Sequence, residues 1–516
     1  MKLKIYNTLN RQVEEFMPIE EENIKIYSCG PTVYHYAHLG NMRSYVFTDI
    51  LNNTLSAIYP ETSIRHVINI TDVGHLVGDG NDGQDKLEKG AQRENKSVYE
   101  IAKYYTEAFL KDVNDLNLGD NEYIKSKVSV GEAYSIENYK KEKIISDKFT
   151  FVRATDYIDE QIALIKKLED KGYTYTTSDG IYFDTSKYTD YAKFAKLNVE
   201  GLEKGKRVED EKDEKKNKTD FALWKFSPSA DSGEARQMEW ESPWGIGFPG
   251  WHIECSAMSE ATLGKHFDIH TGGIDHIPVH HTNEIAQSVC AHSGENTENK
   301  FVNYWMHNNF LNDVSGKMSK SNEDFLRLKT LTDEGYDPSA YRYLLLTTNY
   351  RKELEFSYES LDAASNALKK LQKYMHEAAK DTDNIIDATK YRINEDWYEK
   401  FMLAMCEDLN TSKALAIMWE LISEEKENKK VENIDAKDVK KTKTKSLHVY
   451  STILKMNKVL GLDLSFSKDV NELNYEDQEI VDDLFTKRKA ARDLKDWVTS
   501  DTLREQIKAF GVEVVD

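Results

Sequence analysis

One stretch near the start of the chain, residues 29–43, restricts the possible fold more than any other. A short alternating run at 24–27 predicts a strand before it, and apolar residues at helix spacing predict a helix after it. A strand, a glycine-bearing loop and a helix aim backbone N–H groups and the positive helix end at one point, which suits phosphate. Gly40 leaves room for a ligand near the backbone, and His38 and Asn41 are candidate donors at the helix mouth. An ordinary turn with a helix cap explains these residues as well when they are taken alone.

The N-terminal part of the chain, to about residue 115, has the pattern of an α/β domain. The apolar segment 63–70 predicts a strand, and the amphipathic segment 98–110 predicts a helix. Thr71 directly follows that strand, and in an open parallel sheet the carboxyl ends of the strands form the edge where ligands bind. Thr71 is therefore a candidate pocket residue, with a plain strand-ending turn as the alternative.

The middle of the chain loses this alternation. Residues 140–143 and 204–218 are dense in charge and predict exposed loops or insertions. Acidic residues interleaved in the second run favour a solvated loop over a nucleic-acid contact. The segment 240–255 is unusually rich in Gly, Pro and Trp, which indicates a shaped binding wall.

Beyond about residue 337 the pattern becomes helical. Apolar residues repeat at spacings of three and four after Ser357 and again after Thr411, both candidate N-caps, so we expect helices that pack on one another. The two apolar stripes consist of Leu361, Ala364, Leu368, Leu371 and Met375, and of Leu415, Met418 and Ile422. The polar segment 426–445 is predicted to be a loop.

A last compact unit, about 472–516, carries basic residues around Trp497. Arg492, Lys495 and Arg504 are the cationic candidates for RNA contact, because basic side chains interleaved with an aromatic ring bind nucleic acid. A solvated helix face explains the same residues equally well.

Bulk properties narrow the class of protein. The chain has 516 residues, enough for several domains, and its formal net charge of -21 argues against sequence-independent coating of nucleic acid, although a local basic strip remains compatible with an RNA substrate. Its four cysteines are too few and too scattered for a disulfide framework, so metal binding or burial in a reducing cytoplasm is expected. No secretory signal and no run of roughly 18 apolar residues is found, so we expect a cytoplasmic protein without membrane contact.

Two sets of residues are candidates for carrying chemistry. His280 and Glu284 are four residues apart, so a helix would place both on one face, and Cys29 and Cys255 are the candidate thiolates of a zinc site assembled by the fold. Buried thiols and a solvated His–Glu pair are the alternative. The run K-M-S-K-S at 317–321 places two lysines beside small hydroxyls after a glycine, which suits a mobile clamp on polyphosphate or else an exposed loop.

The combination of motifs is more specific than any of its parts. The sequence H-L-G-N at 38–41 resembles the HIGH signature, and 317–321 matches KMSKS, so the chain resembles class I aminoacyl-tRNA synthetases. Within that class, C-G-P-T-V-Y at 29–34, G-W-H-I-E-C-S-A-M at 250–258, D-I-H-T-G-G-I-D at 268–275 and H-H-T-N-E-I-A-Q at 280–287 resemble the cysteinyl-tRNA synthetase family. The resemblance runs from Met1 to near the C-terminus.

The resemblance implies a fold and a domain order. We expect an α/β fold with a Rossmann-type class I synthetase catalytic domain split by an insertion, then an α-helical bundle and a small C-terminal anticodon-binding domain. The expected boundaries are 1–117 and 246–305 for the two catalytic halves, 118–245 for the connective insertion, 306–355 for the stem-contact region with the KMSKS loop, 356–470 for the bundle of DALR type, and 471–516 for the anticodon-binding domain.

The resemblance also implies a role for each matched residue. One zinc ion per chain would be held by Cys29, Cys255, His280 and Glu284. ATP, with Mg²⁺, would be bound by His38, Gly40, Asn41, Lys317 and Lys320. The substrate cysteine would be framed by Thr71, Trp251, His270 and Asp275. The tRNA would be contacted by Arg492, Lys495, Trp497 and Arg504.

The function implied is a cysteine–tRNA ligase. Such an enzyme activates L-cysteine with ATP to cysteinyl-adenylate and transfers it to the 3′ end of tRNA(Cys). A soft metal distinguishes a thiol from a hydroxyl directly, so no hydrolytic editing site is expected. A monomer is expected. The alternatives are a ligase that joins cysteine to a small amino-sugar acceptor, which should lack the unit at 472–516, and a non-catalytic tRNA-binding paralogue, which should have damaged ATP loops.

The chain departs from the family pattern in four places, the first being Asn41, which stands where the HIGH signature has its second His. Phe248 stands where the family usually has Arg, which removes a charge near the pocket. Residues 127–152 resemble an insertion, and neither their role nor that of 204–219 follows from the sequence. The chain stops at Asp516, before an expected tryptophan-bearing tail, so either anticodon reading is altered or the C-terminus is truncated.

Overall fold

The structure, a computed structural model, describes residues 1–73, 96–119, 144–145, 148–196, 214–227, 238–250, 252–295, 300–313, 326–381, 392–432, 439–465, 475–493, 496–510 and 512. The site predictions at Lys317, Lys320, Trp251 and Lys495 lie outside these residues. The chain divides into two compact units. The first contains Met1–Asn312, Thr348–Glu355 and Leu403–Asn410, and the second contains Asp313–Thr347, Phe356–Met402 and Thr411–Asp516.

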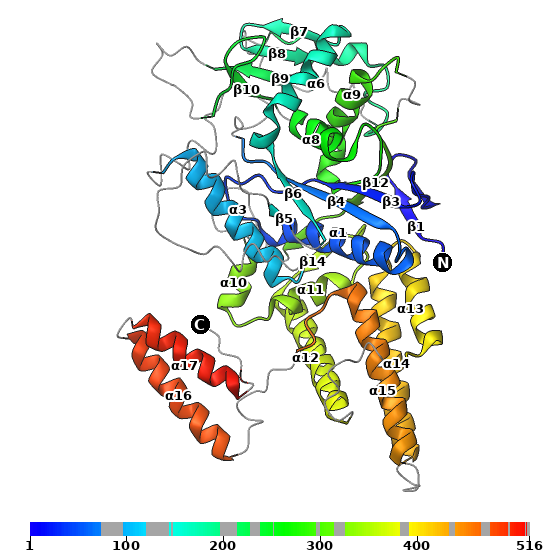
Figure 1. The fold of residues 1–516 in the computed structure, drawn as a ribbon, viewed down its shortest axis with the longest axis vertical. Coiled ribbons are helices and arrows are strands. Elements are labelled where there is room, and N and C mark those ends of the chain that lie inside the picture. Colours follow the sequence, from blue (N-terminus) through cyan, green and yellow to red (C-terminus); the bar gives the residue numbers. More distant parts are fainter. Residues whose placement is uncertain are drawn as a thin grey trace. The chain divides into compact units, whose positions relative to one another are not determined.

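A six-stranded sheet forms the centre of the first unit (Figure 1). Its strand order is β12 (Val302–Asn308), β11 (Phe267–Gly273), β3 (Asn23–Ser28), β4 (Ser63–Ile70), β6 (Thr150–Arg153) and β5 (Ile144–Ile145). All neighbours are parallel except β5 and β6. The predicted strands at 24–27 and 63–70 are confirmed by β3 and β4. Both are rich in apolar residues, which suits a parallel sheet that is covered on both faces.

Helices cover this sheet on both sides. Figure 1 shows α1 (Leu39–Ile58) on one side and α8 (Ile253–Leu263) and α9 (Thr282–Ala291) on the other. The helix predicted at 98–110 is α3 (Val98–Asp115), which extends further toward the C-terminus. Ser97 caps α3 in a reciprocal pair with Glu100, which explains why the helix begins where the sequence indicates.

The direction of winding reverses between β3 and β11. From β3 the chain moves through α1 to β4 and then to β6, whereas β11 and β12 lie on the opposite side of β3. In open α/β sheets, ligands bind beyond the carboxyl ends of the strands at such a reversal. Cys29 follows β3 and Thr71 follows β4, so both residues lie at this edge.

A second, four-stranded antiparallel sheet has the order β10 (Gly247–Pro249), β9 (Phe221–Phe226), β8 (Gly180–Phe183) and β7 (Thr174–Thr177). Phe248 is buried in β10, in register with Lys225.

The segment 127–152 supplies β5 and most of β6, so its last residues extend the central sheet. The remaining short elements of this unit are β1 (Lys4–Asn7), β2 (Gln12–Glu15), η1 (Ala154–Tyr157), α6 (Ile158–Asp170), η2 (Thr185–Lys187), η4 (Ile274–His276) and the π-helical turn η5 (Ile277–His281).

The second unit is mainly helical. Its elements are α10 (Leu328–Asp333), α11 (Pro338–Leu346), α12 (Tyr358–Asp381), α14 (Thr411–Glu432) and α15 (Val439–Leu460), while β13 (Leu311–Asp313), β14 (Leu354–Phe356) and α13 (Glu395–Cys406) span the division between units. Both predicted apolar stripes are buried. Ser357 accepts from the Ser360 backbone N–H as the predicted cap, whereas Thr411 is itself the first residue of α14.

The prediction of a loop at 426–445 was wrong. The helix α14 continues to Glu432 and α15 begins at Val439, so most of this polar segment is helical. Lys and Glu are good helix formers, and residues 426–428 of α14 are exposed, so this part of the helix needs no apolar residues. A polar segment is therefore not necessarily a loop.

The C-terminal part of the second unit is a pair of helices, α16 (Tyr475–Asp493) and α17 (Trp497–Ala509). Val481, Ile507 and Val512 form their small apolar core. Within the part of the chain that the structure describes, no helix is both long and apolar enough to cross a membrane.

Candidate metal centre and active site

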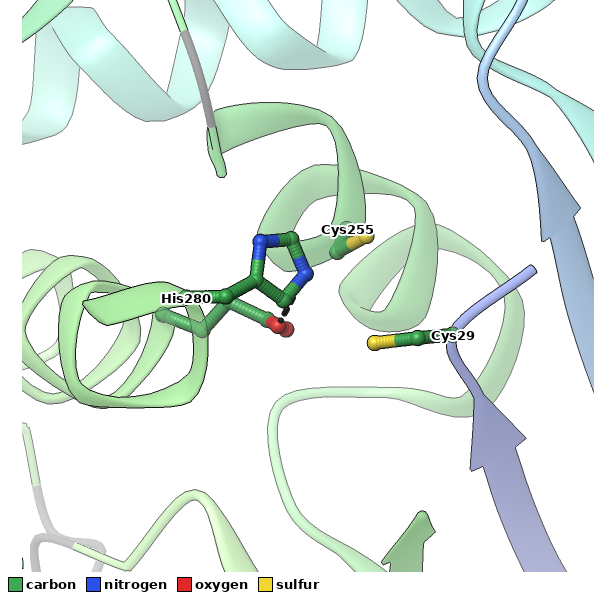
Figure 2. Close-up of side chains that lie close together, drawn as sticks. Cys29, Cys255 and His280 are labelled. Carbon is green, nitrogen blue, oxygen red and sulfur yellow. Dashed lines mark ion pairs between the residues drawn. The ribbon is translucent and has the colours of Figure 1, made fainter. Parts of the chain in front are cut away.

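The fold brings the four predicted metal ligands together. Cys29 follows β3, Cys255 lies in α8, His280 in η5 and Glu284 in α9. One ligand atom from each lies within 4.8 Å of the others, and Figure 2 shows Cys29 at the end of a strand with Cys255 and His280 on helices around one small volume. Zinc bonds of about 2.0–2.3 Å place the ligand atoms of one ion at comparable separations.

The environment of these side chains fits a cation. His280 Nε2 and Glu284 Oε1 are 2.9 Å apart, yet neither atom has a hydrogen-bond partner among the described residues. Glu284 is fully buried. A buried carboxylate oxygen and imidazole nitrogen that face each other without a hydrogen bond are costly unless something else occupies their lone pairs. Two thiols, an imidazole and a carboxylate are also a donor set that zinc prefers.

The pKa shifts at the site also fit a bound cation. Burial raises the pKa of Cys29, and a hydrogen bond from Cys29 lowers the pKa of Cys255 against the effect of burial. Burial alone would lower the pKa of His280 and raise that of Glu284. The charges of Glu284 and Cys255 instead raise the pKa of His280, and His270 and His280 together lower the pKa of Glu284. A divalent cation could therefore replace the protons of Cys29 and His280.

A chain of hydrogen bonds that the sequence did not indicate supports Cys29 from behind. His281 Nε2 lies 3.2 Å from Cys29 Sγ, His281 Nδ1 lies 2.7 Å from His307 Nε2, and His307 Nδ1 lies 2.8 Å from the Thr8 hydroxyl. All three partners are buried. The adjacent pair His280–His281 was the only sequence signal, because Thr8 and His307 come from distant parts of the chain.

Two predicted pocket residues lie close to the metal cluster. His270 Nε2 is 3.0 Å from Glu284 Oε2, and its ring is fully buried and stacked on Trp305. His270 therefore contacts a candidate ligand from the side of the core. Asp275 lies in η4, and its charge acts on both Cys29 and His38: it adds to the effect of burial that raises the pKa of Cys29, and it partly opposes the effect of burial that lowers the pKa of His38. Asp275 is therefore near both the cluster and the mouth of α1.

His38 and Asn41 form a reciprocal cap at the start of α1. The Asn41 backbone N–H donates to His38 Nδ1 at 3.1 Å, and the His38 backbone N–H donates to the Asn41 side chain at 3.1 Å. Burial lowers the pKa of His38, which keeps the ring neutral near pH 7. A neutral ring that accepts at Nδ1 carries its proton at Nε2. Gly40 lies in this first turn, where a Cβ atom would come within 3.0 Å of the His38 ring.

The predicted RNA-contacting residues within the described part of the chain lie on the C-terminal helix pair. The Arg492 guanidinium lies 5.9 Å from the centre of the Trp497 ring, a cation–π contact, and Trp497 is 57% exposed. Arg504 lies on α17 and is paired with Asp501. Arg492, Trp497 and Arg504 therefore occur on one small helical unit.

Comparison with known families identifies the class of protein. A family model described as tRNA synthetases class I (C) catalytic domain matches residues 15–137 and 122–366, and a DALR domain model matches residues 400–465. A methionyl-tRNA synthetase of Mycobacterium tuberculosis bound by methionyl-adenylate has the same fold, with a TM-score of 0.56 at 13% identity over 85% of this chain and 92% of that chain. A LeuRS of Agrobacterium radiobacter gives a TM-score of 0.56 at 10% identity over 87% and 85%. The fold is that of a class I aminoacyl-tRNA synthetase.

Curated relatives narrow the class further. Cysteine–tRNA ligases of Burkholderia lata, Novosphingobium aromaticivorans and Treponema denticola are 43%, 40% and 39% identical to this chain, over 100% of it and 95%, 95% and 98% of their own lengths. The chain belongs to the cysteine–tRNA ligase family. The predicted resemblance and fold class are confirmed, and neither the amino-sugar ligase nor the non-catalytic paralogue is favoured.

Proposed function

We propose that the protein is a ligase that activates L-cysteine with ATP and transfers the cysteinyl group to the 3′ end of tRNA(Cys). The observation that carries this proposal is the cluster of Cys29, Cys255, His280 and Glu284 at the carboxyl edge of the sheet, beside the mouth of α1. The cluster supplies a place for a thiol, and the helix mouth supplies a place for the phosphates of ATP. The two lie together in the first unit.

The cluster is proposed to bind zinc. When bound, zinc would accept the substrate thiol as a further ligand and favour its ionised form, which a serine hydroxyl cannot match. Cys29 and Cys255 supply the soft donors, and His280 and Glu284 fix the remaining positions. His281 and His270 orient Cys29 and Glu284 through the hydrogen bonds described above. Discrimination against serine thus occurs at binding, without an editing step.

The mouth of α1 is proposed to bind the ATP phosphates. The cap fixes the neutral His38 ring with Nδ1 as an acceptor and Nε2–H as a donor, and the helix end adds positive potential. Lys317 and Lys320 are proposed to follow the charge that develops on the leaving pyrophosphate. Magnesium would accompany the nucleotide. Adenylate formation then depends on positioning and charge stabilisation, without a covalent enzyme intermediate.

The remaining assignments concern the amino acid and the RNA. Thr71, Asp275, His270 and Trp251 are proposed to frame cysteine. The helix pair α16–α17, within the proposed anticodon-binding domain 471–516, is proposed to contact tRNA through Arg492, Lys495, Trp497 and Arg504.

ATP–pyrophosphate exchange tests the proposal without tRNA. We expect exchange with cysteine and none above background with serine, in a sample that contains about one zinc per chain. Transfer of labelled cysteine to tRNA(Cys) then tests the second step. A zinc-loaded sample that exchanges neither amino acid would contradict the proposal.

A further inference from the structure

The side chain of Asn69 bridges two parts of the sheet edge. Its Oδ1 accepts a hydrogen bond of 2.7 Å from the Gly30 backbone N–H, directly after the candidate zinc ligand Cys29. Its Nδ2 donates to the Thr71 hydroxyl oxygen at 2.9 Å. Asn69 is buried near the end of β4. The bridge therefore joins the strand end that carries Cys29 to the proposed cysteine-contacting residue Thr71.

The orientation of this bridge is determined by its chemistry. A backbone N–H can only donate, so the atom of Asn69 that faces Gly30 must be the oxygen. The amide nitrogen then faces Thr71, whose hydroxyl oxygen must act as the acceptor. Because one lone pair of that oxygen is occupied, the hydroxyl proton points away from Asn69 and can be donated to another acceptor.

The backbone of Thr71 does not depend on this bridge. Its N–H donates to the Pro31 carbonyl at 2.9 Å, and its carbonyl accepts from the Val33 N–H at 3.1 Å. These two hydrogen bonds fix Thr71 against the loop after Cys29. The contact from Asn69 Nδ2 therefore adds nothing to where Thr71 lies, and its effect is on how the Thr71 hydroxyl is turned.

We infer that Asn69 is a positioning residue of the cysteine pocket, which holds the Thr71 hydroxyl with its proton available to the substrate. The inference rests on the proposed role of Thr71. Asn69 acts through Thr71 and does not itself touch the substrate. Because Asn69 is hydrogen bonded to both Gly30 and Thr71, it also keeps the Thr71 hydroxyl at a fixed distance from the strand end that carries Cys29.

The substitution Asn69→Asp tests this orientation specifically. The carboxylate keeps an acceptor for the Gly30 N–H but places a second acceptor against Thr71, so the hydroxyl turns its proton inward. We expect the Kd for cysteine, measured by calorimetry on zinc-loaded protein, to rise about three- to tenfold, the range of one hydrogen bond. The Kd for ATP should not change.

A double-mutant cycle with Thr71→Val separates this mechanism from others. Without the hydroxyl, Asn69→Asp should have no further effect on the Kd for cysteine. A direct effect of the new charge would persist in the Thr71→Val background, and that result would overturn the inference. Asn52→Asp, at a buried amide of α1 that is 3.3 Å from His66, is the matched control and should leave both Kd values unchanged.

Three further outcomes of these experiments also test the inference. If Asn69→Asp does not fold, Asn69→Ser enters the same cycle, and additivity with Thr71→Val overturns the inference. If Thr71→Val binds cysteine normally, both the Thr71 assignment and the inference fail. If wild-type protein binds cysteine but does not support pyrophosphate exchange, the proposed function fails, while the cycle of Kd values still decides the role of Asn69.

Discussion

His280 and Glu284 lie one helical turn apart, with 2.9 Å between Nε2 and Oε1, and neither atom is hydrogen bonded within the described part of the chain. An i, i+4 pair on a helix surface is common, but this pair is buried beside two cysteines. His270 occupies the other oxygen of Glu284. One carboxylate oxygen is therefore held in place and the other is directed at the cluster, which is the arrangement that a metal ligand requires.

The first prediction concerns Glu284. Glu284→Gln removes the charge and keeps the shape, so we expect zinc affinity to fall by about tenfold or more. Competition with a coloured chelator measures the affinity directly. Glu260→Gln is the matched control, because Glu260 Oε2 is 2.8 Å from His292 Nε2 in a comparable His–carboxylate pair outside the cluster. Equal zinc affinity in the two variants would refute the ligand role of Glu284.

The second prediction concerns the thiols. Cys255→Ser replaces a soft donor by a hard one, so we expect zinc content to fall and the KM for cysteine to rise more than tenfold, with the KM for ATP nearly unchanged. Cys290→Ser is the control, since Cys290 is equally buried but lies outside the cluster, and burial raises its pKa to about 12. Full zinc content with normal cysteine kinetics in Cys255→Ser would exclude the assignment.

The sequence predicted the parts of the fold that depend on local pattern. The strands β3 and β4 have enough apolar residues to be recognised alone, and the caps at Ser97 and Ser357 are local features. The loop prediction at 426–445 was wrong because it rested on polarity. Residues such as Lys and Glu favour a helix even where they are not buried.

The site also contains residues that the sequence predicted and residues that it did not. The ligands at Cys29 and Cys255 carry distinctive side chains inside distinctive motifs, so a resemblance could place them. His307 and Thr8 could not be found, because their role depends on which strands lie side by side, and β12 joins the sheet next to β11 only in three dimensions. Asn69 was missed for the same reason, since its partners Gly30 and Thr71 flank different strands.

The third prediction concerns Gly30. A Cβ atom at this position would lie 1.5 Å from the Asn69 carbonyl oxygen, so Gly30→Ala must push the loop after Cys29 away from β4. We expect the free energy of unfolding to fall by about 4 kcal/mol or more, which is larger than the effect of most single substitutions. Urea unfolding followed by tryptophan fluorescence measures it. Gly264→Ala is the control: its φ is +95° with no atom within 4 Å, so it should cost only about 1–3 kcal/mol of backbone strain.

The fourth prediction concerns pH and His66. Burial lowers the pKa of this ring to about 3, from an ordinary value of about 6.5, while Ser28 and Asn52 bond its two nitrogens. Below pH 6.5 the unfolded chain therefore takes up a proton that the folded chain does not. The stability that the neutral ring contributes is complete above about pH 6.5 and is lost as the pH falls toward 3.

His66→Gln removes this titration. We expect the slope of unfolding free energy against pH, between pH 6 and pH 4, to decrease by about 1.4 kcal/mol per pH unit, the equivalent of one proton. The difference between variant and wild type at pH 8 measures the packing effect alone, since the ring is neutral there in both folded and unfolded chains. An unchanged slope would show that His66 takes up its proton equally in both states.

The last prediction concerns the contact between Arg492 and Trp497, and it separates charge from stacking. Arg492→Ala should weaken tRNA binding and reduce the slope of log K against log salt concentration by about 0.7–0.9, because one phosphate contact is lost. Trp497→Ala should weaken binding by about 1–3 kcal/mol through lost stacking, with the slope unchanged. Pyrophosphate exchange without tRNA should be normal in both variants.

Lys487→Ala is the matched control for charge on the same helix. Lys487 is exposed and already paired with Asp483, so its removal should change neither the affinity for tRNA nor the salt slope. If all three variants lowered the affinity equally and with the same slope, the helix pair would attract tRNA only by its general charge. Different slopes for Arg492→Ala and Trp497→Ala instead require that the two side chains meet a phosphate and a base at one place on the RNA.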